Sequence, residues 1–291
     1  MFKQKLEAFY NKYYKILMLI PIILLVLSLI FVGFKYAKTG EIFNRDVTLK
    51  GGITSTIYTD KDINTEDLQN KIPNSLVKKL TDFSTGRQVG IIVEASDISA
   101  DNLKESLQKE LAIELTDQNY SVEETGSSLG ESFYKELITA VLIAFIFMAI
   151  VIFITFRTLI PSAAVVLSAL IDIIIPLAII NLLNIKVSSA GVVAFLLLIG
   201  YSVDTDILLT TRALKRYNAP LFDRMYSSMK TGLTMTFCAI AVMVTGIILS
   251  TTPIIKEMFF IILLGLITDI FSTYFTNASI LKIYCKRKNI A

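Results

Sequence analysis

The chain has 291 residues, with 28 Lys and Arg against 25 Asp and Glu, no His, two Cys and a mean hydropathy of +0.63. A composition this apolar excludes a single soluble domain, because too little polar surface is available to cover it. The lack of His excludes His-dependent catalysis and the usual zinc sites, and a net charge of +3 spread over separate loops is not the basic stripe that nucleic acid requires.

Six apolar runs are long enough to cross a membrane, which takes about 20 residues. The first, at about 16 to 34, follows a basic N-terminus and lacks a small-residue cleavage site, so we interpret it as an uncleaved span. The other five runs lie at about 135 to 156, 159 to 183, 187 to 209, 229 to 250 and 255 to 280. The sequence therefore predicts a polytopic α-helical membrane protein with six transmembrane helices.

Basic residues in the short loops predict how these spans are oriented. Only Lys186 and Lys256 lie in the short loops on one side, while the side of the termini carries the rest: Lys3, Lys5, Lys12, Lys15, Arg157, Arg212, Lys215, Arg216, Arg224, Lys230, Lys282, Lys286, Arg287 and Lys288. Cytoplasmic loops carry the excess of Lys and Arg. We therefore expect both termini to be cytoplasmic, in the cell membrane, with residues 35 to 134 outside the cytoplasm.

Residues 35 to 134 are polar enough to form a soluble domain. The segments VTLKGGITSTIYT, TEDLQNKIPNSLVKKL, RQVGIIVEA, SADNLKESLQKELAIEL and YSVEET predict strand, helix, strand, helix and strand in that order. We expect a small α+β domain of the ferredoxin-like kind, with Ile53 and Ile57 on one face of the first strand and Ser99 as a helix N-cap. A domain of this size suits gripping or docking better than catalysis.

The predicted organisation thus has four parts: 1–34 with the first span, the extracytoplasmic domain at 35–134, a five-helix bundle at 135–281 and a basic cytoplasmic tail at 282–291. Cys238 lies in an apolar run and Cys285 in the tail, so we expect neither a disulfide nor a metal cluster in the soluble domain. With no nucleophile, ligand set or cofactor loop, we expect no enzyme activity, cofactor or metal.

Four acids within the apolar runs are candidate functional residues: Asp172, Asp204, Asp206 and Asp269. A carboxylate in hydrocarbon costs about 2.5 to 3.5 kcal/mol on insertion scales, so such residues usually face a cavity or partner and often mark ion pathways. Asp204 and Asp206 are about 200° apart around a helix and cannot point at the same neighbour. We predict proton handling, with Lys230 as a candidate counter-charge. The alternative is that the acids are structural, hydrogen-bonded to Ser168, Thr205 or Thr273.

Small residues within the apolar runs suit close helix packing better than hinges. These are Gly191, Ala194, Gly200, Gly232, Gly246 and Gly265. Gly51 and Gly52 in LKGGIT lack the rest of a phosphate loop and predict a bulge or turn in the strand. The basic loop RALKRYNAPLFDRMYSSMK is a topology signal that could also contact a cytoplasmic partner or membrane lipid.

These residues resemble the SecF family, and its archaeal members more than its bacterial ones. The resemblance covers nearly the whole chain and is carried by RDVTLKGGIT, SLGESFYKE, ALIDIIIPLAIINL, IGYSVDTDILLTTRALK, MKTGLTMTF and GLITDIFSTYFTNASIL. It implies pairing with SecD in an assembly of the resistance-nodulation-division type, and help to export through the Sec channel that draws on the proton gradient in bacteria.

The same resemblance assigns individual residues. Asp172 matches the acid of the family's third span, and Gly200, Tyr201 and Ser202 match its fourth. Where bacterial members read Asn-Asp-Thr, this chain has Asp, Thr and Asp at 204 to 206, and Asp204 falls where bacterial SecD has its intramembrane acid. Lys230 replaces a bacterial arginine, which keeps the charge and loses the fork geometry.

We therefore predict an accessory subunit of the Sec translocase that acts with SecD, the Sec channel and the translocating polypeptide. Two alternatives stay open. One is a structural subunit that stabilises SecD or the channel without ion coupling. The other is a resistance-nodulation-division exporter of a lipid or small molecule.

Overall fold

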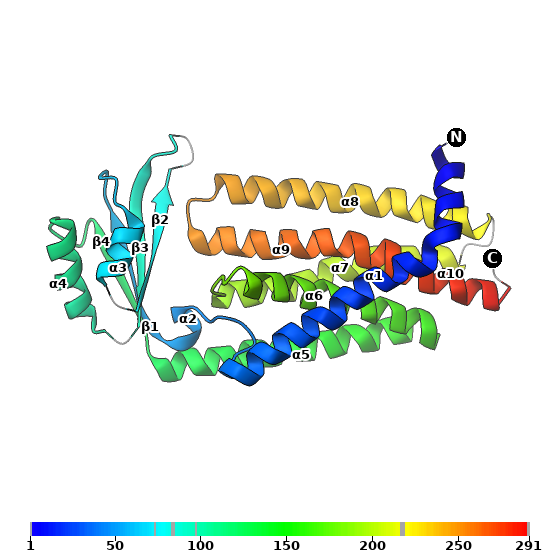
Figure 1. The fold of residues 1–291 in the computed structure, drawn as a ribbon, viewed down its shortest axis with the longest axis horizontal. Coiled ribbons are helices and arrows are strands. Elements are labelled where there is room, and N and C mark those ends of the chain that lie inside the picture. The colour runs from blue at the N-terminus through cyan, green and yellow to red at the C-terminus, as the bar shows by residue number, and fades with distance from the viewer. Residues whose placement is uncertain (1, 73, 83–84, 97, 216–218, 290–291) are drawn as a thin grey trace.

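The computed structural model describes residues 2–72, 74–82, 85–96, 98–215 and 219–289, and it has two parts (Figure 1). A bundle of long helices forms one part, and a small sheet with two helices caps one end of it (Figure 1). Both ends of the described chain lie at the opposite end of the bundle (Figure 1). Of the basic residues used to predict orientation, Arg216 and the side chain of Lys215 lie outside the described part.

Five described helices are long and apolar enough to span a membrane. They are α1 (Phe2–Thr39), α5 (Ser127–Phe156), α6 (Leu159–Leu182), α7 (Ser189–Lys215) and α8 (Leu221–Leu249). The last apolar run forms α9 (Pro253–Phe271), the π-helix η1 (Ser272–Asn277) and α10 (Ala278–Arg287), which follow one another without a break. Helix α9 carries three charged residues, Lys256, Glu257 and Asp269, within its 19 residues.

The helices α6 and α7 form the centre of the bundle. About half of their most apolar stretches is buried, 50% and 56%, against 6% in α5 and 11% in α1. Exposed apolar side chains such as Phe147 and Ile154 on α5 therefore face lipid or a partner subunit. The centre of the bundle is where polar side chains can be shielded from hydrocarbon.

The soluble part follows α2 (Val47–Lys50) and has the order β1 (Gly52–Tyr58), α3 (Thr65–Lys71), β2 (Ser75–Thr81), β3 (Gln88–Ala95), α4 (Ala100–Leu111) and β4 (Tyr120–Thr125). The sheet is antiparallel with the strand order β2-β3-β1-β4. Ile53 and Ile57 are buried on one face together with Leu103 and Leu107 of α4, as predicted. The predicted N-cap is also present, since Ser99 Oγ accepts a hydrogen bond from the N–H of Asn102 at 3.4 Å.

The segment TEDLQNKIPNSLVKKL differs from its prediction as a single helix. Helix α3 ends at Lys71, and the rest of the segment forms β2, so the sheet has four strands instead of three. Ile72 is followed by a proline in the sequence and adopts an extended conformation, with φ −108° and ψ 106°, as residues before proline prefer. Val77 and Leu80 are buried in the resulting strand.

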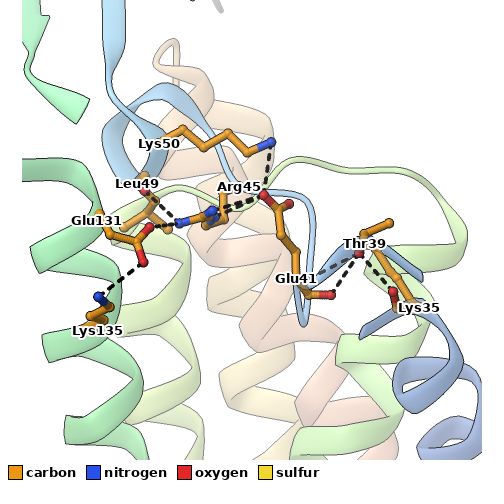
Figure 2. A network of polar contacts seen from close by, with 8 residues as sticks. All are labelled: Lys35, Thr39, Glu41, Arg45, Leu49, Lys50, Glu131 and Lys135. Atoms are coloured by element: carbon orange, nitrogen blue, oxygen red, sulfur yellow. Dashed lines mark hydrogen bonds and ion pairs between the residues drawn. The ribbon is translucent and has the colours of Figure 1, made fainter. Parts of the chain in front are cut away.

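A network around Arg45 ties the chain entering the soluble domain to the helix leaving it (Figure 2). Arg45 donates to Glu131 on α5 at 2.5 Å, to Glu41 at 3.1 Å and to the carbonyl of Leu49 at 3.4 Å. Its guanidinium also lies over the ring of Tyr134, with its central carbon 4.6 Å from the ring centroid. These contacts hold the base of the domain at the end of the bundle.

The glycine pair closes the same junction. Gly51 and Gly52 have φ values of +87° and +145° and connect α2 to β1, so they form a turn at the start of the strand. A Cβ atom on Gly51 would lie 2.4 Å from the Cα of Ser127, the first residue of α5. The close approach of the two chain segments and the backbone conformation both require glycine at position 51.

We expect Gly51→Ala to destabilise the junction by roughly 2 kcal/mol or more, because non-glycine residues are strained at this φ and the new methyl group meets backbone. The matched control is Gly126→Ala, since Gly126 has an ordinary φ of −62° and nothing within 4 Å of a built Cβ. Hydrogen exchange of residues 47 to 58 in the full-length protein measures the effect. Equal protection in the two variants would contradict it.

A buried charge cluster lies on the sheet face that turns away from α3 and α4. Lys78 Nζ donates to Glu94 Oε1 at 2.5 Å, and Glu94 is only 4% exposed. Burial raises the pKa of Glu94 to about 7, the nearby Asp46 carboxyl adds to this, and Lys78 partly offsets it. Glu94 therefore holds a proton in the folded domain at pH values where the unfolded chain has lost it.

The sign of the resulting pH dependence follows from linkage. Between about pH 4.5 and pH 7 the folded state binds more protons through Glu94, so its contribution to the free energy of unfolding falls as pH rises, by roughly 1 to 3 kcal/mol. Hydrogen exchange of β1 and β3 across this range measures the slope. We expect Glu94→Gln to flatten it and Glu124→Gln, at an exposed position of β4, to leave it unchanged; an unaltered slope in Glu94→Gln would refute the assignment.

Candidate intramembrane ion site

Three carboxylates meet at the centre of the bundle. Asp172 lies on α6, Asp206 on α7 and Asp269 on α9, and their exposed fractions are 0%, 0% and 1%. One carboxylate oxygen from each lies within 4.8 Å of the others. We call these three residues the acid cluster.

Hydroxyl groups and one amide surround the acid cluster. Asp172 accepts hydrogen bonds from Ser202 and from Ser272 Oγ, the latter at 2.6 Å. The hydroxyl of Thr205 lies 2.9 and 3.0 Å from the two oxygens of Asp269, and Thr273 donates to the same carboxylate at 3.0 Å. The donors thus connect α6 and α7 to the helix formed by α9 and η1.

The carboxylate of Asp206 accepts fewer hydrogen bonds than those of Asp172 and Asp269. Asn277 Nδ2 donates to its Oδ1 at 2.7 Å. Within the described part of the chain, the other oxygen of Asp206 and the amide oxygen of Asn277 are buried without a hydrogen-bond donor. A buried acceptor of this kind is stabilised by a proton or another cation.

The π-helix η1 places three of these donors. It interrupts the α-helical register at Ser272–Asn277, and Ser272, Thr273 and Asn277 are each 0% exposed. Single-turn π-helices inside α-helices occur frequently at functional sites, because the wider turn re-aims side chains. Here η1 directs the side chains of Ser272, Thr273 and Asn277 toward the acid cluster.

Charge balance limits what the acid cluster can do. Among the ion pairs of the described residues, none joins Asp172, Asp206 or Asp269 to a Lys or Arg side chain. Three negative charges at this spacing in a low-dielectric bundle would repel one another strongly. The site therefore suits exchange of protons, and its oxygens are also of the type that hard cations prefer.

The structure separates the predicted acids into two groups. Asp172, Asp206 and Asp269 come together, while Asp204 is exposed on the outer face of α7, so the prediction that Asp204 and Asp206 point apart is confirmed. Lys230 is exposed on α8, and the ion pairs of the described residues do not include it, so its role as a counter-charge stays a prediction.

Sequence reasoning missed Ser272 and Asn277, although a polar run, STYFTN, inside an apolar span was a usable signal. The structural alternative named Thr205 and Thr273 correctly as hydrogen-bond partners. Ser168 is buried beside them on α6. Ser202 had been singled out only as part of a family motif, and its contact with Asp172 gives it a physical role.

Gly200 and Tyr201, which belong to the same family motif as Ser202, lie away from the acid cluster. Tyr201 is 47% exposed, and a Cβ on Gly200 would meet nothing within 4 Å, so the prediction of close packing is wrong at Gly200. It is confirmed at other positions: a Cβ on Gly265 would lie 2.2 Å from Leu198, and one on Gly232 would lie 2.1 Å from the hydroxyl of Tyr274. Gly200 and Tyr201 thus belong to the outward face of α7 that also carries Asp204.

We expect Thr205→Val to destabilise the bundle by about 1 to 3 kcal/mol, because it removes one of the two hydroxyl groups that donate to the buried Asp269. Thr234→Val is the matched control, since Thr234 is exposed on α8 and donates only to the carbonyl of Lys230 among its described contacts. Thermal unfolding in detergent can be followed with a thiol-reactive dye that reports exposure of the buried Cys285 in a Cys238→Ser background. Equal melting temperatures would contradict the expectation.

Comparison with known proteins identifies the family. The family model "Protein export membrane protein SecD/SecF, C-terminal" matches residues 104–287. Proteins named protein-export membrane protein SecF are similar along nearly the whole chain: that of Methanocaldococcus jannaschii is 37% identical, covering 94% of this chain and 96% of its own length, and that of Pyrococcus furiosus is 32% identical, covering 98% and 96%.

Solved structures agree in fold. A crystal structure of SecDF from Thermus thermophilus, described as a translocon-associated membrane protein, matches 96% of this chain with a TM-score of 0.72 at 17% identity. A SecDF structure in its super-membrane-facing form matches 93% with a TM-score of 0.61. The chain spans 38% of the length of each of these proteins. The chain therefore belongs to the SecD/SecF family of protein-export membrane proteins and matches its SecF members along nearly its whole length.

Proposed function

We propose that the chain is a SecF-type subunit that acts with SecD to promote protein export across the cell membrane, and that the acid cluster couples this work to the proton gradient. Its archaeal SecF relatives support the export role. One observation carries the coupling: three buried carboxylates lie within 4.8 Å of one another on three different helices. We propose no enzymatic reaction and no cofactor for this subunit.

The proposed topology has six spans, with α9 and the helical turns that follow it forming the sixth. The common location of both described ends, opposite the sheet, supports an even number of crossings (Figure 1). The excess of basic residues at that end supports cytoplasmic termini and an extracytoplasmic sheet domain. The strand order β2-β3-β1-β4 with two crossing helices supports a ferredoxin-like domain.

Exposed faces of the bundle support assembly with SecD. The solved SecDF proteins are much longer than this chain, which matches 38% of their length, so a SecD-like region forms part of the same polypeptide there. We propose that the outward face of α7, with Tyr201 and Asp204, contacts SecD, because an exposed acid in a span needs a partner. The Sec channel and the translocating polypeptide are the further proposed partners of the assembly.

The proposed coupling depends on the position of the acid cluster, which lies between α6, α7 and α9. Adding or removing a proton changes the repulsion between Asp269 on the last span and the acids on α6 and α7. Helix α9 runs from Asp269 to the domain end of the bundle, where Glu257 accepts a hydrogen bond from the N–H of Ser188 at 2.9 Å. A charge crossing 100 mV supplies about 2.3 kcal/mol, enough to shift such a helix between two positions.

Two other functions use the same residues differently. In a structural subunit the acid cluster would serve only as hydrogen-bonding glue, which the donors Thr205 and Thr273 also fit. In a small-molecule or lipid exporter the extracytoplasmic domain would need its own substrate pocket, and the similarity to SecF proteins favours export of polypeptide instead.

We expect Asp206→Asn to lower secretion of a reporter preprotein several-fold in cells where it is the only copy, while membrane level and co-purification with SecD stay unchanged. The reason is that the asparagine amide cannot release or accept a proton, although it occupies nearly the same volume as the aspartate carboxyl. A proton uncoupler should add no further loss in this variant, and a sodium ionophore should leave wild-type secretion unchanged.

Asp204→Asn is the matched control, because Asp204 lies on the same helix and is exposed. We expect it to alter co-purification with SecD more than it alters sensitivity to the uncoupler. Normal, uncoupler-sensitive secretion by Asp206→Asn would show that the acid cluster is structural. Loss of SecD co-purification by Asp206→Asn would favour the structural subunit.

A further inference from the structure

A cleft of about 520 Å³ separates the soluble domain from the end of the bundle that it covers. Strand β2 contributes Leu76 and Lys78 to it, and the bundle contributes the loop between α6 and α7 and the facing ends of α8 and α9. Figure 1 shows β2 standing opposite the ends of these two helices. The cleft thus lies at the level where the spans emerge from the membrane.

Three lysines line this cleft: Lys78, Lys186 and Lys256. Lys186 and Lys256 are the two basic residues in the short loops on this side of the bundle, where basic residues are otherwise avoided. Lys186 lies in the loop between α6 and α7 and Lys256 in the first turn of α9, and the fold brings both to one cleft, next to a third lysine from β2.

Three acids lie near these lysines, and one of them, Asp46, is buried at the start of α2. Lys78 is paired with Glu94, and Glu257, which also lines the cleft, accepts a hydrogen bond from the backbone of Ser188 at the start of α7. In the described part of the chain, the ion pairs include neither Lys186 nor Lys256. Charge complementarity therefore calls for an anionic occupant.

The walls below the lysines are apolar. Ile185, Ile247 and Phe260 line the cleft, and Phe260 lies seven residues into α9, about 10 Å below its start at Pro253. This depth takes the cleft from the headgroup region toward the first part of the acyl chains. An occupant with an anionic head and an apolar tail matches both levels.

We propose that the cleft binds an anionic phospholipid of the leaflet on the domain side, with its phosphate between Lys186 and Lys256 and the start of an acyl chain against Ile247 and Phe260. The lipid then holds the sheet domain to the membrane surface. An extended polypeptide fits less well, because the N–H of Val77 on the edge strand β2 is already occupied by Gln69 Oε1 at 3.2 Å.

Native mass spectrometry of the full-length protein in detergent, titrated with phosphatidylglycerol or phosphatidylcholine, tests this. We expect one tight phosphatidylglycerol site, and its affinity should fall roughly 30-fold in the double variant Lys186→Gln, Lys256→Gln, since each lysine near a membrane surface contributes about a factor of five. Lys38→Gln is the control, because Lys38 is exposed at the end of α1 nearest the sheet domain, and it should leave the lipid site intact. Replacing the two lysines by Arg should retain it.

A second variant separates charge from shape. Ile247→Trp keeps both lysines and fills the apolar wall, so it should also weaken phosphatidylglycerol binding, while inorganic phosphate alone should not compete. Equal phosphatidylglycerol binding by wild type and the double glutamine variant would overturn the proposal. The proposal would also be overturned if the double glutamine variant kept its lipid site but lost cross-linking between the cleft and a translocating chain. That result would assign the cleft to polypeptide.

Discussion

Mutual repulsion of three carboxylates in a low-dielectric bundle is the constraint on which the rest of this structure depends. The acid cluster of Asp172, Asp206 and Asp269 is tolerated because hydroxyl groups of α7 and η1 donate to it. These donors require α6, α7 and α9 with η1 to pack closely, and the absence of a side chain at Gly265 on α9 permits this packing against Leu198 on α7. With α6 and α7 at the centre, α1, α5 and α8 lie at the periphery of the bundle, where their apolar faces contact lipid or a partner.

The soluble domain depends on the bundle in a second way. The Arg45 network (Figure 2) fixes the place where the chain enters and leaves the domain. The turn at Gly51 packs against the start of α5, so the domain has a firm base on that helix. Strand β2 at its other side faces the bundle across a charged cleft. A domain held firmly at one side and separated from the bundle by a cleft at the other is suited to tilt, and in the proposed function tilting would convert a helix shift into a pull on an emerging chain.

Much of this arrangement could be predicted from local pattern. Apolar length gives the spans, basic loops predict orientation, and helical geometry separates Asp204 from Asp206. The meeting of Asp172, Asp206 and Asp269 could not be predicted, because it depends on which helices are neighbours across nearly 100 residues of sequence. The surroundings of Lys230 also depend on how the helices pack, and its side chain is exposed on α8. The composition of residues 65 to 80 favours helix throughout and hides strand β2, although a proline at position 73 is a signal that a helix ends before it.

Infrared difference spectroscopy of the protein with SecD in sealed vesicles tests the central claim most directly, since the carbonyl stretch of a protonated carboxyl is distinct from that of a carboxylate. If the acid cluster couples the proton gradient, acidifying the domain side should produce a carboxyl signal that is lost in Asp206→Asn and kept in Asp204→Asn. A spectrum in which the carboxyls keep the same protonation state under both directions of the gradient would contradict proton coupling by these residues.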